Sequence, residues 1–165
     1  MPKPKYDPSK ELPFDLDKVT LPQRLGIYFA LVAHQQRYAI RNVARGLDSL
    51  YFNSMRWQPK VTMSRLDDFR RHHAAKLAKY RHWGHDELIA EVLSGVNFEE
   101  VPHTFRPVQQ VEFTLAYEKA RWHLITSFRK YKELSQDAAA HEADVDDSAI
   151  IDQEAADLAE DAAHA

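Results

Sequence analysis

The feature that most constrains the fold is the stretch from Pro107 to Gln136, in which apolar residues follow a helical period. One stripe recurs at spacings of three and four residues, as one face of an α-helix does. A second group falls on roughly the opposite side, where Glu118 and Arg129 interrupt it. Because a helix that is apolar on two sides must be covered on two sides, we expect it at the centre of a helical bundle. The first stripe comprises Phe113, Tyr117, Ala120, Leu124, Phe128, Tyr131 and Leu134; the second comprises Val108, Val111, Leu115 and Trp122.

A second long helix is predicted to begin after Thr20, which has the spacing of a capping box with Gln23. The apolar period continues to about Trp57, and Pro59 should stop the helix. Gly46 is a candidate bend. At 1.5 Å per residue the helix would be a rod of roughly 50 Å.

The first half of this helix is apolar nearly all round, since Ile27 and Leu31 lie off its core face. A helix of this kind is buried by other helices or by another subunit. We therefore name Ile27 and Leu31 as candidate interaction residues.

Two shorter helices complete the predicted fold. Ser64 has the features of an N-cap and Gly84 those of a C-terminal stop, and a further helix spans about Asp86 to Ser94. With only 4 glycines and no alternating strand pattern, the chain is predicted to be all-α. We expect a helical bundle in which the two long helices are roughly antiparallel partners.

Three regions are predicted along the chain. Residues 1–19 contain four prolines among charged residues and suit an extended N-terminal arm. Residues 20–136 form the helical bundle. Residues 137–165 are an acidic tail, in which Ile151 and Leu158 lie on one side of a short amphipathic segment and are also named as interaction residues.

Charge is distributed unevenly over these regions. Residues 137–165 contain ten of the 25 acidic residues and none of the 22 basic ones, although the whole chain carries a net charge of only −3. The bundle region is correspondingly basic, and a basic helical surface can contact an acidic protein partner or nucleic acid. The candidate binding residues are Arg37, Arg41, Arg45, Arg70, Arg71, Lys76 and Lys79.

The sequence contains no pattern that indicates catalysis. There is no cysteine, no glycine-rich phosphate loop and no nucleophile-elbow serine. His72, His73, His82 and His85 are close in sequence, but none pairs with a second ligand at a metal-binding spacing. We expect no catalytic residue, no metal, no cofactor and no small-molecule substrate. The N-terminus lacks the apolar region of a signal peptide, and the longest apolar run is too short to cross a bilayer.

Two functional hypotheses follow. The first is a non-enzymatic structural or assembly protein, a helical subunit of a larger complex whose basic body and acidic tail form subunit contacts. A virus or phage particle is the first assembly to consider, so the expected location is the cytoplasm or a viral particle. The alternative is a nucleic-acid-binding helical protein whose acidic tail covers its own basic surface.

Overall fold

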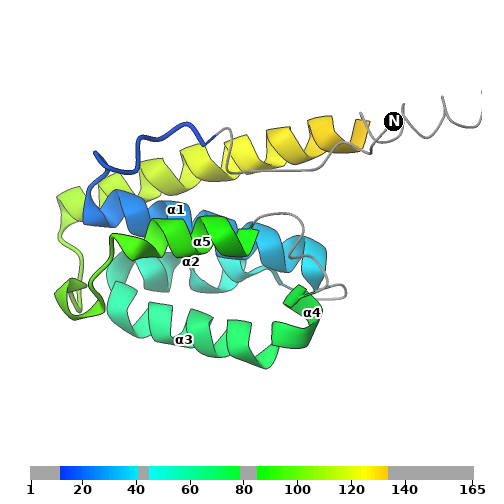
Figure 1. Ribbon diagram of the computed structural model, residues 1–165. Helices are drawn as coiled ribbons and strands as arrows, with labels where there is room; N and C mark the ends of the chain where they lie inside the picture. Colours follow the sequence, from blue (N-terminus) through cyan, green and yellow to red (C-terminus); the bar gives the residue numbers. More distant parts are fainter. Residues whose placement is uncertain (1–11, 41–44, 79–84, 134–165) are drawn as a thin grey trace, which may run out of the picture. The chain divides into compact units, whose positions relative to one another are not determined.

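The computed structural model describes residues 12–40, 45–78 and 85–133. It contains the α-helices α1 (Leu21–Ala39), α2 (Leu47–Trp57), α3 (Pro59–His72), α4 (Ala74–Ala78) and α5 (His85–Ser94), the 3-10 helix η3 (Phe98–Glu100), and a last helix that occupies residues 107–133 (Figure 1). No strand occurs in the described ranges, and the predicted all-α class is confirmed. The chain divides into two compact units, and residues 5–128 make up the larger one.

The centre of this unit is α1 and not the 107–133 helix. Every residue from Leu25 to Gln36 is buried, because α2, α4 and α5 contact α1 and the 107–133 helix packs along it. The central position of α1 explains why its residues off the predicted core face, Ile27 and Leu31, are also apolar. Both are completely buried within the chain itself, so neither is available to a partner.

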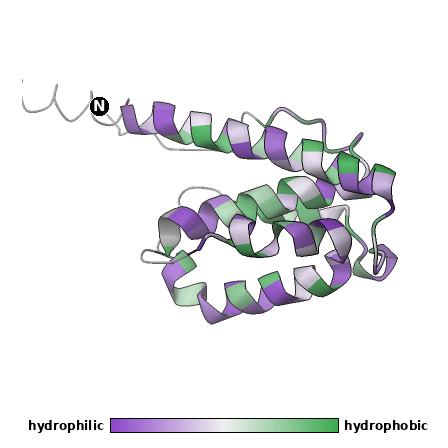
Figure 2. Cartoon of the chain, turned by 180° about the vertical axis from the view of Figure 1, so that it is seen from behind, coloured by the Kyte–Doolittle hydropathy of each residue, from purple (hydrophilic) through white to green (hydrophobic). Residues whose placement is uncertain are grey.

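The predicted apolar stripe of the 107–133 helix does face the core. Phe113, Tyr117, Ala120, Leu124 and Phe128 are buried, whereas Leu134 lies outside the described residues. The second stripe is exposed. The prediction that both faces are covered is therefore wrong, and in Figure 2 hydrophobic and hydrophilic residues alternate along this helix.

Close contact between α1 and the 107–133 helix depends on Gly26. A β-carbon at this position would lie 2.5 Å from the carbonyl oxygen of Phe113 and 2.9 Å from the amide nitrogen of Tyr117. Next to this contact, the ring of Phe29 packs against Phe52 of α2 and Tyr117 at centroid distances of 6.4 and 5.4 Å. The glycine therefore lets two backbones approach while neighbouring aromatic rings fill the space around them.

The predicted single helix from Thr20 to Trp57 is instead two helices. The capping box at Thr20 and Gln23 is confirmed, but α1 ends at Ala39 and α2 begins at Leu47 after Gly46. The buried side chain of Gln36 accepts a hydrogen bond from the backbone N–H of Leu47 at 3.1 Å. One glutamine thus satisfies a donor at the start of α2 that would otherwise have no partner within its helix.

The two long helices are parallel and not antiparallel. In the contacts between the two helices, the residue numbers increase in the same direction along both. Gly26 lies beside Phe113, and the ring of His34 lies 5.7 Å from that of Phe128. The break before α2 adds one reversal of the chain, which inverts the direction expected for the last helix (Figure 1).

The start of α3 also differs from the prediction. Pro59 occupies the first turn of α3, where its missing N–H costs nothing. Ser64 lies within the helix, and its hydroxyl donates to the carbonyl of Lys60 at 3.4 Å. Gly84, the predicted C-terminal stop, lies outside the described residues.

The part of the predicted N-terminal arm that is described, residues 12–19, lies against the bundle. Leu12, Phe14 and Leu16 pack on the core. Arg24 of α1 donates to the carbonyl of Val92 at the end of α5 at 3.1 Å and to the carbonyl of Leu16. Because one guanidinium bridges both carbonyls, it holds this segment, α1 and α5 together.

Candidate functional site

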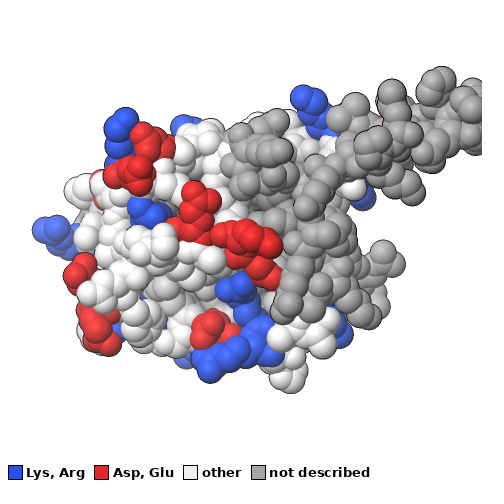
Figure 3. Space-filling model, viewed as in Figure 1, with Lys and Arg blue, Asp and Glu red and all other residues white. Residues whose placement is uncertain are grey.

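Part of the predicted basic surface is neutralised by carboxylates of the same chain. Arg37 pairs with Asp48 at 3.0 Å, Arg70 pairs with Asp86 at 3.1 Å, and Arg71 pairs with Asp67 at 2.6 Å and with Asp68 at 3.3 Å. Figure 3 shows acidic and basic residues interspersed on one face of the molecule. Three of the five candidates that the structure describes therefore already have a counter-ion within the protein.

Two other candidates are accessible. Arg45 and Lys76 are exposed and form no ion pair with a described residue. Arg41 and Lys79 lie outside the described residues. The described part of the chain therefore does not gather the seven predicted residues into one unpaired basic face, and nucleic-acid binding stays an untested prediction.

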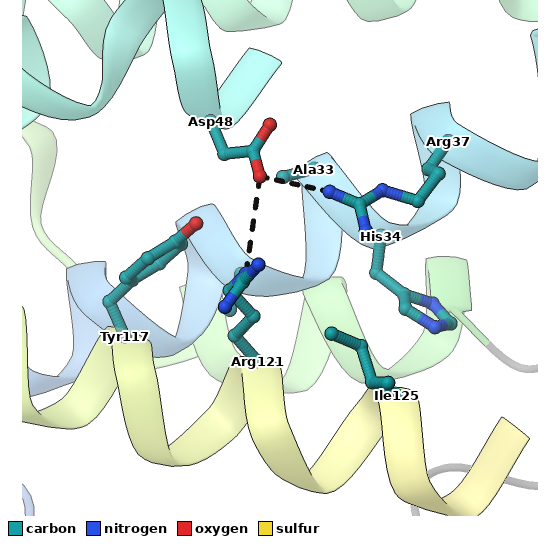
Figure 4. Close-up of a pocket in the computed structure, with 8 residues that line it drawn as sticks. Ala33, His34, Arg37, Asp48, Tyr117, Arg121 and Ile125 are labelled. Atoms are coloured by element: carbon teal, nitrogen blue, oxygen red, sulfur yellow. Dashed lines mark hydrogen bonds and ion pairs between the residues drawn. The ribbon is translucent and has the colours of Figure 1, made fainter. Parts of the chain in front are cut away.

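The pair formed by Arg37 belongs to a junction of three helices (Figure 4). Asp48 of α2 lies between Arg37 of α1 and Arg121 of the 107–133 helix, with Arg121 Nε 4.0 Å from the carboxylate. Burial raises the pKa of the nearby Tyr117 hydroxyl to about 12, and the charge of Asp48 adds to this effect. Since each charged group faces an opposite one, the junction joins helices rather than presenting a reactive group.

A pair of buried histidines lies at the contact of α1 and α5. His34 Nδ1 and His85 Nε2 are 2.8 Å apart, so one ring donates a hydrogen bond to the other. Burial lowers the pKa of His34 to about 3, with a further contribution from His85, and burial lowers that of His85 to about 4. Both rings are therefore neutral at pH 7.

The residue after His85 extends this contact. Asp86 accepts hydrogen bonds from Gln35 at 2.9 Å and from Arg70 at 3.1 Å. In the sequence, His85 stands out only as a neighbour of His72, His73 and His82, and its pairing with a residue 51 positions away was not predicted. No periodic signal could have revealed it, because the pairing depends on how α5 packs on α1.

Two observations on the described residues concern metal binding and catalysis. No group of three or more metal-binding side chains is placed to hold an ion within them. A hydrogen bond of 3.2 Å joins Ser127 and His123, one helical turn apart. No described carboxylate hydrogen-bonds to His123, so the third group that would orient a general base is missing.

The most conspicuous surface feature is the outward face of the 107–133 helix, which we call the outer stripe. It consists of Val108, Val111, Leu115 and Trp122, whose exposed fractions are 71%, 57%, 66% and 68%. Large apolar side chains exposed in a row are typical of a surface that binds another molecule.

A groove runs beside the outer stripe, between α2 and the 107–133 helix. It has a volume of about 370 Å³, and Arg56, Gln110, Val111, Thr114 and Leu115 are among the residues that line it. The outer stripe therefore borders a groove that both polar and apolar side chains line. The other predicted interaction residues, Ile151 and Leu158, lie outside the described residues.

A comparison with protein families identifies the group to which this chain is related. The model of a family described as CRISPR-associated protein (Cas_Csd1) matches residues 3–125. The chain belongs to the Cas_Csd1 family. The match covers the N-terminal segment, α1 to α5 and most of the 107–133 helix, including the complete outer stripe. No curated protein matches the chain.

Membership of the Cas_Csd1 family corrects the predicted function. The hypothesis of a virion structural protein is wrong, because the match assigns the chain to CRISPR-associated proteins, and the viral-particle location has no support. Cas_Csd1 proteins are subunits of multi-protein CRISPR complexes, which supports the prediction of protein partners. None of the described helices is both long and apolar enough to cross a membrane.

Proposed function

We propose that this chain is a non-enzymatic component of a CRISPR-associated complex and that it binds a protein partner through the outer stripe. The observation that carries the proposal is the exposure of Val108, Val111, Leu115 and Trp122 on a helix whose opposite face is firmly packed. A helix needs only one apolar face to fold onto a bundle, so the second face has no role in the described fold.

The absence of an enzymatic role is part of the same proposal. The polar clusters around Asp48 and around the two buried histidines connect helices. We propose the cytoplasm as the location.

The test compares two valine substitutions. Val111 lies on the outer stripe and Val61 lies on α3, with exposed fractions of 57% and 44%. Both Val111→Asp and Val61→Asp place a carboxylate on an exposed helical position. The full-length chain would be co-expressed with the other CRISPR-associated proteins of the same system, and the retained partners would be quantified after affinity purification.

We expect Val111→Asp to reduce partner retention at least tenfold, because a charge at the centre of an apolar contact must be desolvated. Val61→Asp should leave retention unchanged. Circular dichroism should show the same helix content for both variants. Equal retention for both would contradict a docking role for the stripe.

A further inference from the structure

We draw no further inference here: the strongest candidate, the exposed apolar patch that the outer stripe forms on the 107–133 helix, already belongs to the proposed function, and nothing in the structure shows what covers it.

Discussion

The two longest helices show how differently similar apolar patterns are used. In α1 every residue from Leu25 to Gln36 is buried, including three polar side chains, because other helices surround it. The 107–133 helix is also apolar on two sides, but only one of them is covered. Apolar character on two faces therefore does not reveal whether the second face meets the same chain or another molecule.

The largest expected difference between the two helices is the loss of stability when one aromatic ring is removed from each. Phe29 of α1 is completely buried against Phe52, Phe113 and Tyr117, whereas Trp122 is 68% exposed. Phe29→Ala should lower the free energy of unfolding by about 3–5 kcal/mol, since it leaves a cavity. Trp122→Ala should change it by less than about 0.5 kcal/mol. Urea denaturation of the dilute protein measures both, and equal losses would contradict the assignment of inner and outer faces.

The second largest effect on stability comes from the buried histidine of α1 and its partner in α5, and it depends on pH. Folding lowers the pKa of His34 from 6.5 to about 3 and that of His85 from 6.5 to about 4. The unfolded chain therefore binds protons more readily, and stability present above pH 6.5 is lost as the pH falls towards the folded pKa values. A single such histidine accounts for about 2 kcal/mol between pH 7 and pH 5.

Urea denaturation at a series of pH values measures this loss. His103→Gln, a change at an exposed histidine, should leave the pH dependence intact. His85→Gln should lower stability at pH 7 and flatten the dependence below pH 6.5. A stability that is constant from pH 7 to pH 5 in the unmodified chain would contradict the burial of the pair.

A smaller effect should come from the contact between the two helices. Gly26→Ala places a methyl group 2.5 Å from the carbonyl oxygen of Phe113, so the backbones must move apart. Overpacking of this kind costs about 1–3 kcal/mol, and the better helix propensity of alanine returns about 0.5–1 kcal/mol. The net result should be a loss of stability.

Gly95→Ala provides the control for this substitution. Its methyl group would meet the guanidinium of Arg24, which can shift more easily than a backbone. Thermal unfolding should therefore show a lower midpoint for Gly26→Ala than for Gly95→Ala. The reverse order would contradict a close approach of α1 to the 107–133 helix.

The sequence predicted the helical class, the capping box at Thr20 and the core face of the 107–133 helix, because each is a local pattern of residues three or four apart. It did not predict the break after Ala39, since this depends on a hydrogen bond from Leu47 to the side chain of Gln36. Because this one break between helices was not predicted, the predicted direction of the last helix was also wrong.

The candidate site could be predicted only in part. The sequence pattern contained the outer stripe together with Glu118 and Arg129, and charged residues on that face were the available sign that water reaches it. The basic residues were found, but their pairing with Asp48, Asp67 and Asp86 depends on tertiary packing. The period of the apolar residues identifies the faces of a helix, whereas the residues that contact each face depend on the whole fold.

Thiol labelling at two leucine positions tests most directly whether α1 is enclosed and the outer stripe is exposed. Leu31 is completely buried and Leu115 is 66% exposed. In dilute full-length protein, Leu115→Cys should react with a thiol reagent within about tenfold of the rate for an unfolded chain. Leu31→Cys should react at least a hundredfold more slowly, since its thiol is reached only when the protein opens. Similar rates at the two positions in the folded protein would contradict the account.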